Sequence, residues 1–243
     1  MRIVAIIQAR MGSTRFPGKV LKNIDGQTML ARVVNRAHRA TLIDELVVAT
    51  TLKSSDEAIV AESRKVNASV FRGNEEDVLD RYYQAAVTYN AENIVRITSD
   101  CPLIDPEEID KVVREFLNQK PDYASNCLER TYPRGLDTEV MTIEALARAW
   151  KEAREPYQRA HVTPYIYQNP SLFRLCSVKA DANYSTHRWT VDTPEDLTFI
   201  RVIYQRLDQG VEFGWEDVMR VLDKEPQLME LNKDIHQKAM GEG

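Results

Sequence analysis

Three basic side chains and two small residues lie close together near the start of the chain, in residues 8–19 (QARMGSTRFPGK). The cations are Arg10, Arg15 and Lys19, and the small residues are Gly12 and Ser13. Arg and Lys neutralise phosphate charge, and small residues let backbone N–H groups approach an anion closely. The loop is therefore predicted to hold a polyphosphate. The alternative is a solvated basic loop without a ligand.

Two common phosphate-binding motifs do not fit this loop. A P-loop has four residues between its glycines and then Lys followed by Ser or Thr. Here five residues separate Gly12 from Gly18, and Val20 follows Lys19. The GxGxxG fingerprint of dinucleotide-binding folds is absent as well. Neither a P-loop nor a dinucleotide site is expected.

Two aspartates far apart in the sequence each follow apolar residues and precede a turn that carries proline. Asp100 stands in ITSDCPLIDP and Asp192 in RWTVDTPEDL, where a short strand is expected to end. Both are expected on the same rim of a sheet as the basic loop. Mg²⁺ prefers such oxygen ligands and takes the rest from phosphate and water. The alternative for each aspartate is a cap on local N–H groups, in a turn for Asp100 and at a helix start for Asp192.

The elements that must position these residues appear as alternating apolar runs and helix-period segments. Strands are expected at residues 3–7, 45–51, 69–72 and 93–98, and helices near 30–37, 54–66 and 78–89 and from Pro106 onward. The helix at 54–66 opens with Ser54 and Glu57, the spacing of a capping box. Four strand–helix units favour a parallel sheet covered by helices on both faces.

The pattern loosens beyond residue 121. Short extended pieces (DYASN, DTEVM and LFRLCSV) mix with helices near residues 143–154 and 162–168, and a last long helix is expected at 194–207. The sheet is therefore expected to continue with some antiparallel pairing. Because no linker or repeat divides the chain, a single α/β domain over residues 1–243 is predicted, with a mostly parallel mixed sheet between helices.

Composition and charge exclude several classes of protein. With 243 residues, of which 43% are hydrophobic, the chain suits a soluble globular protein, and a net charge of −5 gives no basic field for nucleic acid. The three scattered cysteines lack CxxC or CxxH spacing, so neither a zinc site nor a disulfide framework is predicted and a reducing compartment, the cytoplasm, is expected. The first apolar run is too short for a signal peptide or a membrane span.

The spelling R-x-G-S-T-R-x-P-G-K, from Arg10 to Lys19, resembles the N-terminal signature of the cytidylyltransferases that make CMP-activated sugar acids. These include the CMP-sialic acid and CMP-Kdo synthetases, and the fuller spelling is most similar to the enzymes of spore-coat polysaccharide biosynthesis. The segments around Asp100 and Asp192 are similar to that family's G-D-x-P-L and V-D-T-P-E-D-L, in which the first Asp binds Mg²⁺. Thr98 and Ser99 stand where the Kdo and sialic acid enzymes usually have Gln-Gly. The sugar pocket is therefore expected to differ.

The resemblance implies a three-layer α/β/α nucleotidyltransferase fold, Rossmann-like and similar to the nucleotide-diphospho-sugar transferases. It implies CTP and a small sugar acid as substrates, Mg²⁺ as cofactor, and a homodimer that binds neither nucleic acid nor membrane. Residues 1–120 would form the nucleotide-binding half and residues 121–243 the acceptor-binding and dimerisation half.

The same resemblance, together with residue chemistry, assigns residues to sites. The expected nucleotide contacts are Ala9, Arg10, Gly12, Ser13, Arg15, Lys19, Thr50, Arg72 and Thr98. The expected catalytic residues are Arg10, Arg15, Lys19 and Asp100, and the expected metal ligands are Asp100 and Asp192. The acceptor candidates are Arg134, Asp137, His161 and Arg188, in segments dense in charged residues, and the arginines among them are suited to bind an acceptor carboxylate. For His161, close to Tyr157 and Tyr165, a packed structural role is the alternative.

The predicted reaction is in-line attack of a sugar-acid hydroxyl on the α-phosphorus of CTP, with release of pyrophosphate. One alternative is a nucleotidyltransferase with a phosphorylated acceptor, such as an NDP-sugar pyrophosphorylase. A second is a glycosyltransferase of a related sheet fold, although no D-x-D stands at Asp100. A third is a binding protein without catalytic activity.

Overall fold

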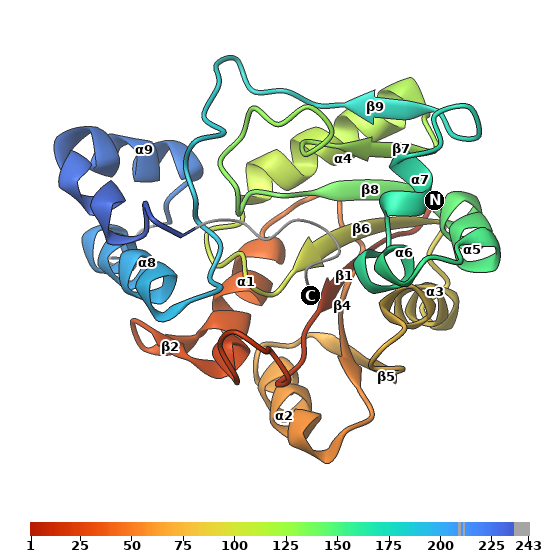
Figure 1. Cartoon of the computed structure of the whole chain (residues 1–243), viewed down its shortest axis with the longest axis horizontal. Helices are drawn as coiled ribbons and strands as arrows, with labels where there is room; N and C mark the ends of the chain where they lie inside the picture. Colours follow the sequence, from red (N-terminus) through yellow and green to blue (C-terminus); the bar gives the residue numbers. More distant parts are fainter. Residues whose placement is uncertain (209, 211, 236–243) are drawn as a thin grey trace.

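A computed structural model describes residues 1–208, 210 and 212–235 of the chain. In this part, a seven-stranded sheet runs through the centre with strand order β5-β4-β1-β6-β8-β7-β9 (Figure 1). Its strands are β1 (Ile3–Gln8), β4 (Glu45–Thr51), β5 (Ser69–Gly73), β6 (Asn93–Thr98), β7 (Tyr123–Ser125), β8 (Glu139–Thr142) and β9 (Leu175–Ser177). A separate small hairpin joins β2 (Asn23–Ile24) and β3 (Gln27–Thr28).

The pairing of the strands is mostly parallel. β1 pairs in parallel with β4 and β6, β4 with β5, and β7 with β9, whereas β8 is antiparallel to β6 and β7. The prediction of four parallel strands followed by some antiparallel pairing is confirmed. The parallel arrangement brings the carboxyl ends of β1, β4 and β6 to the same edge of the sheet.

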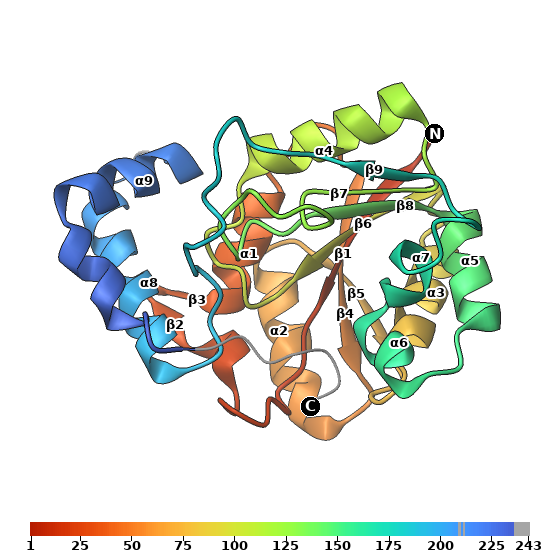
Figure 2. The ribbon, with the colours of Figure 1, turned by 45° about the horizontal axis from the view of Figure 1, so that its top comes forward.

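Helices cover both faces of the sheet, and alternate residues of each strand feed two cores. In β1, Ile3, Ala5 and Ile7 join one core while Val4 and Ile6 join the other. Helices on the first face are α1 (Met29–Ala37), α2 (Glu57–Lys65), α4 (Pro106–Gln119), α8 (Pro194–Leu207) and α9 (Trp215–Lys224). The second face carries α3 (Val78–Thr88), α5 (Ile143–Glu152), α6 (Pro156–His161) and α7 (Pro164–Tyr167), which lie together in Figure 2. Three short 3₁₀ helices are η1 (Lys19–Leu21), η2 (Ser54–Asp56) and η3 (Pro226–Leu231).

Two helix starts follow from local caps and agree with the sequence. Asp105 accepts hydrogen bonds from the amides of Glu107 and Glu108 at the start of α4. Thr193 and Asp196 cap α8 reciprocally, so that this helix covers the predicted residues 194–207.

Three local predictions were wrong. The capping box at Ser54 does not form, because Ser54 belongs to η2 and α2 begins at Glu57. The helix predicted near residues 162–168 is shorter than expected, since α7 covers only Pro164–Tyr167. The segment before Asp192 is not a strand but an extended piece with one isolated bridge, between Arg134 and Arg188. No helix in the described ranges is long and apolar enough to cross a membrane.

Candidate active site

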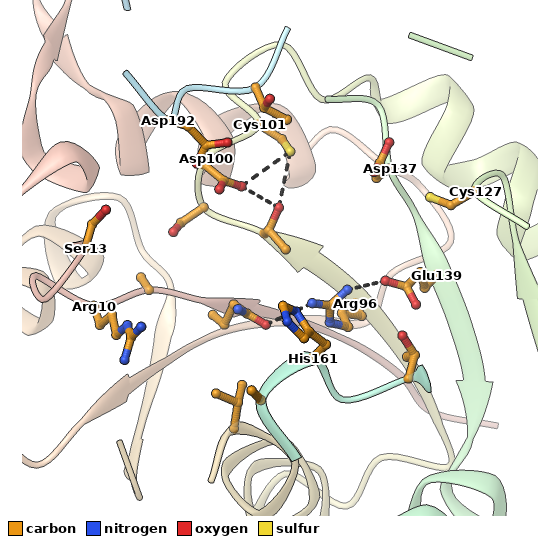
Figure 3. Close-up of a pocket in the computed structure, with 18 of the residues that line it drawn as sticks. Arg10, Ser13, Arg96, Asp100, Cys101, Cys127, Asp137, Glu139, His161 and Asp192 are labelled. Carbon is orange, nitrogen blue, oxygen red and sulfur yellow. Dashed lines mark hydrogen bonds and ion pairs between the residues drawn. The ribbon is translucent and has the colours of Figure 1, made fainter. Parts of the chain in front are cut away.

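A large open cavity lies at the carboxyl ends of β1 and β6 and extends over the sheet face that α3 and α6 cover (Figure 3). Its volume is about 1050 Å³. Typical small-molecule pockets hold about 300–1,000 Å³, so this cavity has room for two substrates side by side. The sides are built by segments far apart in the sequence, from the basic loop to the residues before α8.

The basic loop is folded against the end of β4. The Ala9 amide donates to the Ala49 carbonyl (3.2 Å) and the Met11 amide to the carboxylate of Asp56 (2.9 Å). Gly18, with a positive φ of 67°, closes the loop by donating its amide to the Met11 carbonyl (3.0 Å). The backbone is thus fixed before any ligand binds, which favours binding of a polyphosphate at low entropic cost.

Asp56 is a residue of this site that the sequence did not reveal. Its side chain is buried and accepts four hydrogen bonds, from the Met11 amide, the Thr51 amide and the hydroxyls of Thr50 and Thr51. Burial alone would raise the pKa of Asp56, but these hydrogen bonds outweigh burial and lower it. An ionised Asp56 therefore ties the basic loop to β4.

Lys19 lies between the two aspartates that were predicted to meet. Its Nζ is 3.0 Å from Asp100 Oδ2, 2.9 Å from Asp192 Oδ1 and 2.7 Å from the carbonyl oxygen of Val191. The segment that carries Asp192 is held in place because the Val191 amide donates to the Asp100 carbonyl (2.9 Å). The two carboxylates and one cation of the basic loop therefore share a single centre.

The charges of this centre stabilise one another. Burial raises the pKa of Asp100, but the Lys19 ammonium and the Thr98 hydroxyl outweigh burial and bring the pKa down to about 2. The pKa of Asp192 is lowered as well, because Lys19 and Arg15 outweigh its burial and the repulsion from Asp100. The pKa of Lys19 is raised, since attraction to both aspartates exceeds the effect of burial. All three groups are charged at neutral pH.

Asp192 is surrounded by arginines. Arg15 lies 3.0 Å from its Oδ1, and Arg188 donates to its Oδ2 (2.9 Å). Arg188 also donates to both carboxylate oxygens of Asp196, at 3.0 Å each. Arg188 does not line the cavity, so its acceptor role is not supported by its position, and the structure instead places it where it orients Asp192.

Three expected nucleotide contacts also lie outside the cavity lining: Gly12, Thr50 and Arg72. The Thr50 hydroxyl donates a hydrogen bond to the carboxylate of Asp56. The Arg72 guanidinium donates to the carbonyls of Thr51 and Lys53 and pairs with Glu57. The other expected contacts do line the cavity, namely Ala9, Arg10, Ser13, Arg15, Lys19 and Thr98.

The acceptor candidates Arg134, Asp137 and His161 all line the cavity. Asp137 is held by a two-pronged ion pair with Arg130 (2.5 and 2.7 Å). The half-buried guanidinium of Arg134 has no hydrogen-bond or ion-pair partner in the described part of the chain. Burial and the neighbouring Arg130 lower the pKa of Arg134. Arg134 is thus a cation that would gain from an anionic ligand.

His161 reaches the cavity from a strained turn. Val162, directly after it, has φ 73° and ψ −58°, and the Thr163 amide donates to the His161 carbonyl (2.9 Å). These values define a γ-turn with positive φ, a rare and strained conformation for a β-branched residue. Burial, and then Arg96, lower the pKa of His161, so its imidazole is neutral at pH 7. Strain of this kind concentrates at functional sites.

The cavity is also lined by polar side chains from the middle of the sheet, which were not predicted from the sequence. Arg96 on β6 pairs with Glu139 on β8 and donates to Gln8 Oε1 on β1 (3.2 Å). The Tyr123 hydroxyl donates to Glu139 Oε2 (2.6 Å). The available signal was a charged residue inside the apolar run NIVRIT.

Two carboxylates, not three, are available for a metal at this centre. No group of three or more His, Cys, Asp or Glu residues with metal-binding geometry exists among residues 1–208, 210 and 212–235. Lys19 Nζ shows that the space between Asp100 and Asp192 stabilises positive charge. A pair of ionised carboxylates fits a divalent cation that completes its shell with phosphate and water.

Comparisons with known proteins agree with one another. The model of a family described as cytidylyltransferase matches residues 4–231. The spore coat polysaccharide biosynthesis protein SpsF of Bacillus subtilis is 34% identical over 235 residues, covering 92% of this chain and 95% of that protein. The 3-deoxy-manno-octulosonate cytidylyltransferase of Solibacter usitatus is 38% identical, covering 88% of this chain and 99% of that protein. The solved structure of a cytidylyltransferase from Leptospira borgpetersenii superposes with a TM-score of 0.91 at 34% identity, covering 98% of this chain and 100% of that one.

Proposed function

The chain belongs to the cytidylyltransferase family and is a nucleotidyltransferase, and from that premise we propose that it transfers CMP from CTP to a hydroxyl of a sugar acid. Pyrophosphate is the second product. The sugar acid is of the nonulosonate or 3-deoxy-octulosonate type, and the product serves surface polysaccharide or glycan synthesis. The similarity to the 3-deoxy-manno-octulosonate cytidylyltransferase of Solibacter supports this class of acceptor, and the similarity to SpsF of Bacillus supports a role in polysaccharide synthesis.

One observation carries the proposal: Lys19, Asp100 and Asp192 meet at one centre in a cavity large enough for two substrates. On one side of this centre the basic loop presents Arg10 and Arg15 for a triphosphate. On the other side Arg134, a cation without a partner in the described residues, is suited to the carboxylate of a sugar acid.

The chemistry follows from this arrangement. The acceptor hydroxyl oxygen forms a bond to the α-phosphorus of CTP, the bond from that phosphorus to the bridging oxygen breaks, and pyrophosphate leaves with the electron pair. The hydroxyl proton passes to water. Lys19 and Arg15 neutralise the charge that builds on the leaving group, and alignment within one cavity supplies much of the remaining acceleration.

Asp100 and Asp192 are the residues that would hold a divalent cation such as Mg²⁺, which supplies positive charge beside the phosphates when bound. Asp100 is the better exposed of the two, with 27% of its side chain accessible against 10% for Asp192. Because Arg15 and Arg188 already contact Asp192, we propose that Asp100 makes the primary contact and that Asp192 supports it.

A pyrophosphate-release assay tests the proposal. The purified chain is incubated with Mg²⁺, each of the four nucleoside triphosphates, and a panel of eight- and nine-carbon sugar acids. We expect release with CTP only and only when an acid is present, together with a CMP–sugar acid adduct in the mass spectrum. Release that depends on a sugar 1-phosphate, or equal release with UTP, would favour an NDP-sugar pyrophosphorylase.

A further inference from the structure

A polar cluster interrupts the otherwise apolar sheet face beneath α3 and α6. It consists of Gln8, Arg96, Glu139 and the hydroxyl of Tyr123, and all four residues line the cavity. Neighbours on the same face belong to the core, among them Val4, Ile6 and Met141. Burying a charged pair costs free energy that apolar residues of similar size would not. Because the cluster lines the cavity, its polar groups can contribute to ligand binding as well as to folding.

The hydrogen-bonding capacity of Arg96 is only partly used inside the protein. A guanidinium has five N–H donors, and two of them are engaged, by Glu139 and by Gln8 Oε1. The Nε atom is buried without a partner among the described residues. The Arg96 side chain remains 12% accessible, and Arg96 is one of the residues that line the cavity. Because the buried Nε is out of reach, the donors left for a bound molecule are the second N–H groups of Nη1 and Nη2.

The charge of the cluster limits which chemical groups a bound molecule can place against Arg96. Arg96 is balanced by Glu139, and His161, whose pKa is lowered, is neutral at pH 7. This end of the cavity thus has no excess positive charge, unlike the position of Arg134. Glu139 would repel a second carboxylate or a phosphate placed here, because no unpaired cation among the residues that the structure describes lies beside it to offset the repulsion. A neutral oxygen, from a hydroxyl or an amide, fits the unused donors of Arg96 better.

The position of Arg96 along β6 limits the length of the acceptor. Thr98, whose hydroxyl donates to Asp100 Oδ1 (2.6 Å), lies two residues further along the same strand face. Two residues of a strand span about 7 Å. A group that touches Arg96 while the reacting hydroxyl lies near Asp100 therefore belongs to a part of the acceptor several bonds away from that hydroxyl.

On these observations we propose that Arg96, held by Glu139 and Gln8, is a specificity-determining residue that donates hydrogen bonds to a neutral oxygen on the tail of the acceptor. The inference rests on the proposed function, because it takes the sugar acid as the second substrate. It adds that the tail beyond the ring, bearing hydroxyl or acylamino groups, is recognised at the sheet surface.

The test compares two acceptors and two pairs of substitutions. The acceptors are the acid that gives the fastest release in the panel and its analogue shortened by the last two carbons. The test variant is Arg96→Met with Glu139→Gln, which removes the donors without leaving a buried charge unpaired. The control variant is Arg32→Met with Asp208→Asn, an ion pair of 2.5 Å whose members do not line the cavity.

Wild type and control are expected to prefer the longer acceptor by about 10- to 100-fold in kcat/KM, the scale of a hydrogen bond from a charged donor. In the test variant this preference is expected to fall to within about 3-fold of unity, with the KM for CTP unchanged. An unaltered preference in the test variant, or none in the wild type, would overturn the inference alone. Failure of the wild type to use any sugar acid would contradict the proposed function itself.

Discussion

At the scale of single residues, the charge of Lys19 is shared between two carboxylates and a backbone carbonyl. Asp100, Asp192 and Lys19 could be predicted from the sequence because each stands in a distinctive motif, Asp100 after β6, Asp192 before α8 and Lys19 in the basic loop. Arg96 could not, because an arginine inside NIVRIT reads as an interruption and its partner Glu139 becomes a neighbour only through strand pairing. The position of Arg188 against Asp196 likewise has no signal in STHRW.

Replacing Lys19 is expected to remove a group that stabilises the departing pyrophosphate. The Lys19→Ala variant should lose about 10²- to 10³-fold in turnover, the effect of removing one stabilising donor. Steady-state pyrophosphate release at saturating CTP measures this directly. Lys22→Ala is the matched control, because Lys22 is exposed, stands in the same segment and does not line the cavity. Equal turnover in the two variants would remove Lys19 from the mechanism.

At the scale of elements, local caps determined the helix boundaries that sequence reasoning found correctly. Asp105 and Thr193 bond the first amides of their own helices, so α4 and α8 begin where the pattern indicates. Asp56 precedes α2, but its carboxylate accepts from the Met11 amide and the Thr51 hydroxyl and caps no amide of that helix. The γ-turn at Val162 separates α6 from α7. It has no sequence signal, because a β-branched residue such as Val disfavours a positive φ.

The connection between Asp56 and the basic loop has a measurable role. In Asp56→Asn one oxygen acceptor becomes an N–H₂ donor that faces other donors. We expect a loss of about 2–3 kcal/mol in the free energy of unfolding and a higher KM for CTP, because the loop is no longer fixed before binding. Urea denaturation and substrate titration measure the two effects. Asp223→Asn, at an exposed position, is the control; an unchanged KM for CTP in Asp56→Asn would show that the loop needs no such support.

At the scale of the whole molecule, one cavity joins the basic loop, which we propose holds the triphosphate, to a part lined by β6, β8 and α6, which we propose as the acceptor half. The parallel sheet and the meeting of its carboxyl ends were predictable, because four strand–helix units constrain the topology. The long-range polar contacts within the acceptor half were not predictable from local patterns. The homodimer and the division at residue 120 stay predictions.

The shared charges make the stability of the molecule depend on pH. Asp100 has a pKa of about 2 in the folded chain, below the value of about 3.9 for an unfolded aspartate. Its contribution is therefore present above about pH 4 and is lost as the pH falls toward 2. Lys19, with a raised pKa, contributes up to about pH 10 and loses its contribution above that.

Urea unfolding at a series of pH values measures this contribution. We expect the free energy of unfolding to fall between pH 4 and pH 2, by on the order of 2 kcal/mol from Asp100. In Lys19→Met the fall should be smaller, because the pKa of Asp100 is no longer depressed. The same slope in wild type and variant would mean that Lys19 does not set the ionisation of Asp100.

We propose above all that the basic loop holds the triphosphate of CTP while Asp100 and Asp192 hold the cation that accompanies it. Crystals grown with CTP and Mn²⁺ test it most directly, because manganese gives an anomalous signal that locates the ion. We expect one peak in contact with the carboxylates of Asp100 and Asp192, with the Lys19 ammonium against the phosphates. A peak bound by phosphates alone, with Lys19 still between the two aspartates, would show that Asp100 and Asp192 do not bind the ion.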